Sequence, residues 1–395
     1  MPPDEGTPRI TLVLSGGGMG HDPRDPLSWS GSALHLVSAL ERRGALADAY
    51  GLRLPPFRAA ALAARRPALN REGWRRRLLR SQAYRDALTG VLREEAARRP
   101  APQVVLQLGA YAQGPSVFDA PVLTYQDGSA AAYASSPYAS AARGASAAEA
   151  LRYERRLARE AACVLTTSAW LAGQMSAAYG LAPGRARSVG LGVARRVRWA
   201  PSDHDYAAPR LLFVGVEFER KGGPELLAAF ARVRAALPAA ELHLVGPRRL
   251  PAGADAPGVT WHGYLGGQVP AEAERFDALL RDCSLFVLPS RYEPFGLAPI
   301  EAMANGLPAV VTDAWALAEN VRDRIDGLRV PPGDPEALAK AVLDLLADPA
   351  ALRAMGEAAA ATPALVGWDA VAGRIVEAAA AALRAASEAR IGDQV

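Results

Sequence analysis

The chain has 395 residues, which exceeds the usual size of a single hydrophobic core, so two domains are expected. Half of the residues are hydrophobic, but no run of about 18 apolar residues occurs, and the sequence therefore predicts no membrane-spanning helix. The formal net charge of +4 is modest for this length and does not indicate a nucleic-acid partner.

The cysteines and the N-terminal residues favour the cytoplasm. Cys163 and Cys283 each open an apolar, strand-like run, and their spacing fits neither a metal site nor a disulfide framework. Both are expected to be small core residues in a reducing compartment. Residues 1–14 have no basic flank and no long apolar region, so no signal peptide is expected.

The first half of the chain alternates short apolar runs with helical periodicity. A helix is predicted over Ser30–Gly44, where the glycine is a stop signal, and Ser168 is expected to cap another helix that runs to about Tyr179. Buried strands are predicted at Arg9–Leu14, Gln103–Leu108, Ala120–Tyr125 and Cys163–Thr167. This alternation is typical of a parallel sheet covered on both faces.

The pattern lapses over Trp199–Arg210, the best linker candidate, and a second series follows. Helices are expected to begin near Gly222, Glu272 and Asp334, and a long Ala-rich helix near Val366. The strands predicted in this half are Arg210–Val216, Ala240–Gly246, Gly258–Gly263, Ser284–Ser290 and Pro308–Thr312. Two such domains imply a cleft, with ligands bound beyond the carboxyl ends of the strands.

A glycine-rich loop follows the first strand. A nicotinamide fingerprint needs the spacing G-x-G-x-x-G at a helix start, and Gly16, Gly18 and Gly20 do not provide it. Flexible glycines let the backbone approach a ligand closely. We interpret the loop as bordering the cleft, with a surface turn as the alternative.

The loop before the helix near Gly222 is a candidate phosphate site. Of the 45 basic residues only Lys221 and Lys340 are lysines, so a compact ammonium stands at this loop in a background of arginine. An ammonium next to helix N-terminal amides suits a phosphate, and Arg220 can share the role. A solvated pair of cations is the alternative.

Two carboxylates flank a third helix start. Pro294 keeps Glu293 out of the helix, which is expected to begin near Gly296 and to end around residues 305–306, with Glu301 about one turn inside. Carboxylates accept pairs of hydroxyl hydrogen bonds, and a helix N-terminus attracts anions. The pattern therefore suggests a diphosphate at the helix start with hydroxyl-rich rings on either side.

With these residues the sequence resembles the family 4 glycosyltransferases, which have the two-domain GT-B fold. The resemblance covers nearly all of the second half in the right order, and the E-x7-E spacing of Glu293 and Glu301 is its strongest part. It implies two Rossmann-like α/β domains facing a cleft. These are an acceptor-side domain at 1–200, onto which the 373–395 helix crosses back, and a donor-binding domain at 201–372.

The resemblance implies retaining transfer from a nucleotide-diphosphate-sugar donor to a hydroxyl acceptor, without metal or cofactor. Glu301 would hold the ribose hydroxyls and Glu293 would sit by the donor sugar. Lys221 and Arg220 would neutralise the diphosphate and stabilise the leaving group. The other donor-binding positions it implies are Gly16 and Gly17 over the phosphates, Gly246, His262 and Tyr264 near the base, and the backbone amides of Phe295, Gly296 and Leu297.

Two positions depart from the family pattern. Val216 stands where many relatives carry an arginine, and Arg220 is the residue that can compensate. The family's mid-domain histidine is absent, and Asp127 is the candidate to contact the donor sugar or the acceptor hydroxyl, or to accept the acceptor proton. A turn formed by Asp127 and Gly128 is the alternative.

The acceptor is left open as a glycan, a lipid-linked molecule or a small molecule. Eleven arginines and four acidic residues lie between Arg65 and Arg99, so this segment is either a solvated helix face or a peripheral contact with the anionic inner face of a membrane. The competing functions are a nucleotide-sugar epimerase of the same fold, a nicotinamide-dependent oxidoreductase, and a catalytically silent binding protein.

Overall fold

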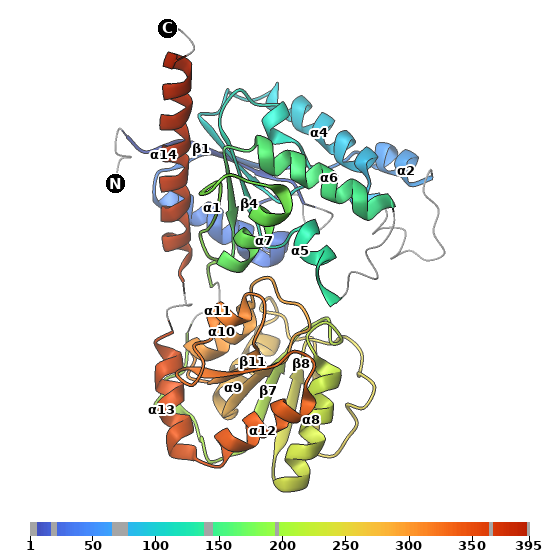
Figure 1. Cartoon of the computed structure of the whole chain (residues 1–395), viewed down its shortest axis with the longest axis vertical. Helices are drawn as coiled ribbons and strands as arrows, with labels where there is room; N and C mark the ends of the chain where they lie inside the picture. Colours follow the sequence, from blue (N-terminus) through green and yellow to red (C-terminus); the bar gives the residue numbers. More distant parts are fainter. Residues whose placement is uncertain are drawn as a thin grey trace. The chain divides into compact units, whose positions relative to one another are not determined.

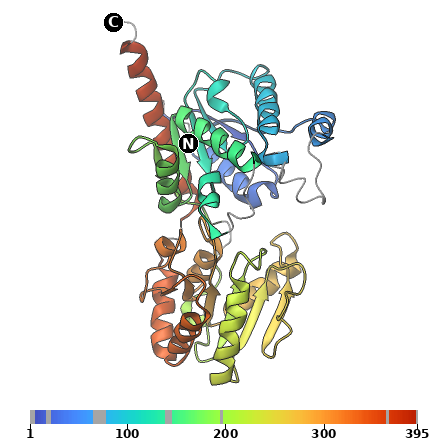
Figure 2. The ribbon, with the colours of Figure 1, turned by 45° about the vertical axis from the view of Figure 1, so that its right-hand side comes forward.

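The computed structural model describes residues 6–16, 22–64, 78–137, 145–193, 197–362 and 366–392. The chain divides into two compact units (Figures 1 and 2). The first unit contains Met1–Ala194 and Val366–Val395, and the second contains Arg195–Leu365.

The first unit is built on a six-stranded parallel sheet in the order β2-β1-β3-β4-β5-β6. Its strands are β1 (Ile10–Leu14), β2 (Leu46–Gly51), β3 (Val104–Leu108), β4 (Val122–Gln126), β5 (Cys163–Thr166) and β6 (Ala186–Ser188). Its helices are α1 (Ser32–Arg42), α2 (Pro56–Ala64), α4 (Gln82–Ala96), α5 (Ala130–Ala134), α6 (Ala145–Glu160), α7 (Ala169–Tyr179) and α14 (Trp368–Gly392). The four strands predicted in this half are confirmed, and every residue of β1, β3, β4 and β5 is buried.

The C-terminal helix α14 belongs to the first unit and packs against α1 (Figure 1). The Arg42 guanidinium forms an ion pair with the Asp369 carboxylate at 3.0 Å, and Arg43 donates to the Asp369 carbonyl at 3.0 Å. The His35 ring stacks on Trp368 with ring centroids 6.3 Å apart. An ion pair, a hydrogen bond and a ring stack therefore tie this last helix to a helix more than 300 positions earlier in the chain.

The second unit repeats the architecture, with the strand order β12-β11-β10-β7-β8-β9. Its strands are β7 (Arg210–Val214), β8 (Glu241–Val245), β9 (Val259–Gly263), β10 (Leu285–Leu288), β11 (Ala309–Thr312) and β12 (Gly327–Val330). Its helices are α8 (Gly223–Ala236), α9 (Pro270–Asp282), α10 (Leu297–Ala304), α11 (Leu317–Asn320), α12 (Pro335–Leu346) and α13 (Pro349–Ala360). The five strands predicted here are confirmed, and Asp334 caps α12 as expected.

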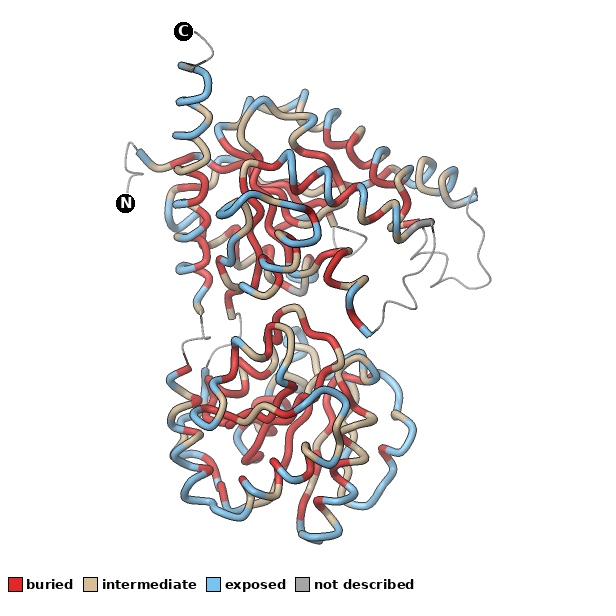
Figure 3. The backbone as a smooth tube through the Cα atoms, in the orientation of Figure 1, coloured by how far each residue is buried: buried red, intermediate tan, exposed pale blue. Residues whose placement is uncertain are grey.

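Burial follows the sheets in both units, as Figure 3 shows by the red tube along the central strands. Cys163 and Cys283 are free, buried thiols, and burial raises the pKa of both, so they pack as small apolar residues. Among the described residues, no helix is both long enough and apolar enough to cross a bilayer.

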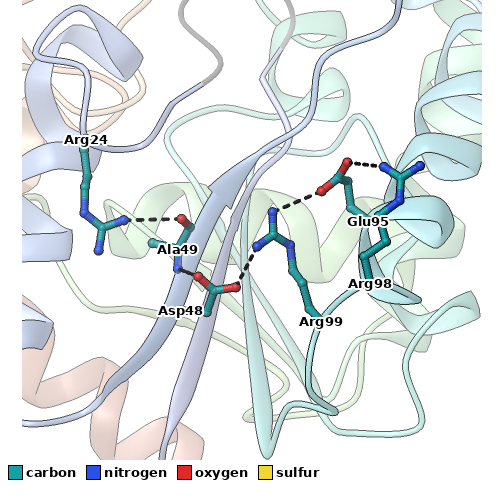
Figure 4. Close-up of polar contacts among 6 residues, drawn as sticks. All are labelled: Arg24, Asp48, Ala49, Glu95, Arg98 and Arg99. Carbon is teal, nitrogen blue, oxygen red and sulfur yellow. Dashed lines mark hydrogen bonds and ion pairs between the residues drawn. The ribbon is translucent and has the colours of Figure 1, made fainter.

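Part of the basic segment is neutralised internally (Figure 4). Arg99 forms ion pairs with Asp48 at 3.2 Å and with Glu95 at 3.0 Å, and it lies over the Tyr50 ring at 4.1 Å. Arg98 also pairs with Glu95, at 3.2 Å. Arg99 thereby links the end of α4 to β2 at the edge of the sheet, whereas residues 65–77 lie outside the described residues.

Candidate functional site

The centre of the candidate site in the second unit is the contact between Lys221 and Glu293. Lys221 lies in the loop after β7 and Glu293 in the loop after β10, and these two strands are neighbours in the sheet. The Lys221 ammonium contacts the Glu293 carboxylate directly, and their side chains are 15% and 7% exposed. Two oppositely charged groups distant in sequence are thereby brought together at the carboxyl edge of the sheet.

Arg220 supplies a second cation to the same place. Its guanidinium donates to the Tyr292 carbonyl at 2.9 Å, pairs with Glu217 at 2.6 Å, and lies 3.9 Å from the Glu293 carboxylate. The Arg291 N–H in turn donates to the Arg220 carbonyl at 2.9 Å. The loops after β7 and β10 are therefore joined by a backbone hydrogen bond and by ion pairs.

Two helices begin at this site, each after a glycine in the left-handed region. Gly222 (φ +75°) precedes α8, and an added Cβ would lie 1.8 Å from the Pro289 carbonyl oxygen. Gly296 (φ +88°) precedes α10, where a Cβ would meet Leu317 at 2.6 Å. Neither glycine cap has a side chain that could bond the helix amides. At α8 the Gly223 N–H donates to the Phe218 carbonyl at 2.9 Å and Pro224 has no N–H, so the first N–H groups left for an anion are those of α10.

The expected helix start at Gly296 is confirmed, with Leu297 as the first residue of α10. Phe295 is buried, and its carbonyl accepts a hydrogen bond from the Asn320 amide, which fixes the loop before the helix. Glu301 is half-buried and lies in the second turn of α10. The loop carboxylate and the helix carboxylate therefore flank the α10 N-terminus along the chain.

Gly246 brings a third loop to the site. It adopts a φ of +117°, and an added Cβ would lie 2.6 Å from the Gly215 carbonyl group. Only a residue without a side chain allows the loops after β7 and β8 to approach this closely. The Gly246 N–H also donates to the Gly263 carbonyl at 2.8 Å, so the end of β9 joins the same edge.

The predicted base-contacting residues differ in how their side chains are engaged. His262 is bonded to His243 (3.0 Å between ring nitrogens) and to Arg275 (3.0 Å), and burial lowers its pKa to about 4. Tyr264 is 44% exposed, with the Arg248 guanidinium 4.3 Å from its ring centroid. Tyr264 and Arg248 thus offer the accessible surface, and the sequence reasoning missed Arg248 although it follows the β8 strand directly.

In the first unit, Asp127 follows β4 and borders two adjoining pockets, of about 270 and about 180 Å³. Its carboxylate accepts a hydrogen bond from the Trp29 indole N–H at 2.8 Å. Asp127 is an exposed residue, and desolvation raises the pKa of its carboxyl. Gly16 lines the smaller pocket, whereas Gly17 lies outside the described residues.

Trp29 is held in an unusual conformation for this contact. Its φ of +49° is rare for a bulky residue, and its ring meets Tyr125 edge to face at 5.2 Å. A strained backbone at a pocket next to a desolvated carboxylate is typical of functional positions. No group of three or more His, Cys, Asp or Glu suited to a metal occurs among the described residues.

Solved structures of similar architecture cover nearly the whole chain. Sucrose-phosphate synthase from Thermosynechococcus elongatus has a TM-score of 0.70 at 21% identity, over 93% of this chain and 98% of that one. WaaG, a glycosyltransferase of lipopolysaccharide biosynthesis, has a TM-score of 0.64 at 15% identity, over the same shares. Anabaena HepE in complex with UDP has a TM-score of 0.62 at 17% identity, again over 93% and 98%. The chain therefore has the GT-B fold.

Sequence comparisons point to the same class. Residues 208–348 match the family model described as Glycosyl transferases group 1. The D-inositol 3-phosphate glycosyltransferase of Segniliparus rotundus is 35% identical over 44% of this chain and 40% of its own length. D-inositol 3-phosphate glycosyltransferase 1 of Catenulispora acidiphila is 32% identical over 54% and 56%. The glycogen synthase of Mycobacterium tuberculosis is 34% identical over 42% and 39%.

The predicted resemblance to the family 4 glycosyltransferases is confirmed, and the match to the group 1 glycosyl transferase model lies within the second unit. The chain spans about 40% to 56% of the length of these two inositol-phosphate relatives. No comparison supports the epimerase or the nicotinamide enzyme.

Proposed function

We propose that the protein is a retaining glycosyltransferase that moves a sugar from a nucleotide-diphosphate-sugar to a hydroxyl acceptor without a metal. The observation that carries the proposal is the Lys221–Glu293 contact beside the N-terminus of α10. Two cations and the amides at the start of α10 suit the negative charge of a diphosphate. The UDP bound to HepE makes uridine diphosphate the first nucleotide to test.

Each charged residue has a role in this proposal. Lys221 and Arg220 stabilise the diphosphate as its charge grows on leaving, which is an electrostatic task of the kind that supplies large rate gains. Glu293 holds the Lys221 ammonium in place and faces the donor sugar. Glu301 accepts hydrogen bonds from the ribose hydroxyls, and the Tyr264 ring offers a surface for the base.

In the proposed transfer, the bond between the anomeric carbon and the diphosphate oxygen breaks, and the diphosphate leaves with the electron pair. The acceptor oxygen bonds to the same carbon on the same face, which retains the configuration. The acceptor proton passes to a base, for which Asp127 is the candidate because desolvation raises its pKa.

A panel of nucleotide sugars tests the proposal. Thermal shift with UDP-, GDP- and ADP-sugars should show stabilisation by one nucleotide class, since a ligand that binds only the folded protein raises the unfolding temperature. With that donor, Glu301→Ala should remove most release of nucleoside diphosphate while the circular dichroism spectrum stays unchanged. Stabilisation by no member of the panel, or full turnover in Glu301→Ala, would refute the assignment.

A further inference from the structure

The larger of the two pockets that Asp127 borders, about 270 Å³, contains charged groups that the transfer mechanism does not use. It extends from Asp127 toward α4, α5 and α6. Besides Asp127, the charged and tyrosine side chains that line it are Arg80, Arg85, Tyr111, Tyr133 and Glu154.

Arg85 is a buried cation that forms no direct ion pair among the described residues. It is 5% exposed, and its contacts are one hydrogen bond to the Arg80 carbonyl at 3.1 Å and the faces of Tyr111 and Tyr153 at 5.4 and 5.2 Å. Within the described ranges, its Nε has no hydrogen-bond partner and no carboxylate forms an ion pair with it. Burial lowers its pKa, and a buried charge without a counter-ion is costly.

Glu154, the nearest acid in the same wall, does not supply that counter-charge in full. It is 3% exposed, and one carboxylate oxygen accepts a hydrogen bond from the Ala130 N–H at 2.8 Å. Burial raises its pKa to about 7, so it carries only part of a negative charge at neutral pH. The pocket lining therefore sets the two guanidinium groups of Arg80 and Arg85 against this one buried carboxyl.

Arg80 adds a second guanidinium, which lies over the Tyr133 ring at 5.1 Å. In the part of the chain that the structure describes, Arg80 forms no ion pair. Asp127 also lines this pocket, and its exposed carboxylate can accept a hydroxyl hydrogen bond. Two arginines and an acceptor carboxylate in one pocket suit a molecule with an anion and a hydroxyl.

We propose that this pocket binds a sugar acceptor that carries a phosphate-type anion beside its hydroxyl groups, with Arg85 and Arg80 holding the anion and Asp127 holding the hydroxyl that receives the sugar. The inference rests on the proposed transferase function and adds the class of acceptor. Guanidinium groups bind phosphate oxygens through paired, charge-assisted hydrogen bonds.

Hydrogen–deuterium exchange measured by mass spectrometry locates such binding. Glycerol 3-phosphate should protect the amides of residues 109–115 and 127–134, and uncharged glycerol should not. Vesicles of phosphatidylglycerol form a second arm, because the same chemistry occurs in a lipid headgroup. Protection of these residues by glycerol 3-phosphate indicates a soluble acceptor, and protection by vesicles alone indicates a lipid-borne one.

Variants make the test specific. Arg80→Gln should weaken glycerol 3-phosphate binding about tenfold or more, since one charge-assisted contact is lost. Arg85→Met should do the same, and the half-buried Arg80 keeps the test valid if Arg85→Met fails to fold. Arg152→Gln, an exposed arginine of α6 outside the pocket, is the matched control and should bind like the wild type.

The inference is overturned if neither ligand protects these residues, if glycerol protects them equally, or if Arg80→Gln binds as tightly as Arg152→Gln. A separate UDP arm reports on the donor site, where protection is expected at residues 215–225 and 293–301. Failure of UDP alone would refute the proposed transferase and leave phosphate binding in the first unit standing.

Discussion

Lys221 shows how much one residue can reveal before a structure is known. As one of only two lysines among 45 basic residues, it was expected at a phosphate site, and the structure puts its ammonium against Glu293. The contact itself was not predicted, because Glu293 was expected beside the donor sugar and Lys221 at the diphosphate. The surroundings of Arg85 and Glu154 could not be predicted either. Arg85 lies 68 residues before Tyr153, and Asp127 lies 27 residues before Glu154, so only the fold brings these side chains together.

Glu154 makes the stability of the protein depend on pH. Its pKa rises from 4.5 to about 7 on folding, so the folded state binds a proton that the unfolded state has released, and stability falls as pH rises between these values. Glu154→Gln removes this cost. We expect the variant to gain up to about 3 kcal/mol over the wild type at pH 8 and much less at pH 4.5, measured by urea unfolding.

The same comparison has a clear negative outcome. A stability difference between Glu154→Gln and wild type that is equal at pH 4.5 and pH 8 would show that the carboxyl does not titrate in this range. Glu160→Gln, at an exposed position of the same helix, serves as the control and should show little change at either pH.

At the scale of elements, the start of α8 depends on Gly222. Alanine there would meet the Pro289 carbonyl oxygen at 1.8 Å and would occupy a left-handed conformation, so we expect Gly222→Ala to destabilise the protein by about 3 kcal/mol or more. Gly173→Ala is the matched control, because this exposed position inside α7 has open space for a Cβ. It should stabilise by about 0.5–1 kcal/mol.

Thermal or urea unfolding of the two glycine variants checks this. A small effect of Gly222→Ala, close to that of Gly173→Ala, would mean that the loop after β7 relaxes freely, and the rigid placement of Lys221 would lose its support.

Among the elements that the sequence did not predict, two strands of the first unit have weak local signals. The β2 strand contains three alanine or glycine residues and the charged Asp48, and β6 has only three residues, two of them exposed. Both are edge strands of the first sheet, where pairing with a neighbour, not residue type, fixes the conformation. The central strands are continuous apolar runs, and these were predicted correctly.

At the scale of the whole molecule, the arginines of residues 65–77 are the basis for predicting contact with an anionic membrane. Six arginines fall within residues 65–77, while Arg98 and Arg99 are engaged with Glu95. We expect co-sedimentation with phosphatidylglycerol vesicles that salt abolishes, because the attraction is electrostatic. Replacing Arg75, Arg76 and Arg77 by Gln should reduce binding severalfold.

The vesicle experiment needs two controls. Phosphatidylcholine vesicles should bind weakly, and replacing Arg384 and Arg390 of α14 by Gln should leave binding unchanged. Equal binding to charged and uncharged vesicles would exclude an electrostatic membrane contact.

The two lysines of the chain offer the most direct test of the donor site. Lys340 is 75% exposed on α12, pairs with Asp344 and has no role in the proposed diphosphate site. Lys340→Ala is therefore the natural control for Lys221→Ala. In calorimetric titration with UDP, or with the nucleoside diphosphate that the thermal-shift panel selects, we expect Lys340→Ala to bind like the wild type and Lys221→Ala to bind at least tenfold more weakly. Equal affinity of the two variants, or no binding by the wild type, would contradict a diphosphate site at Lys221.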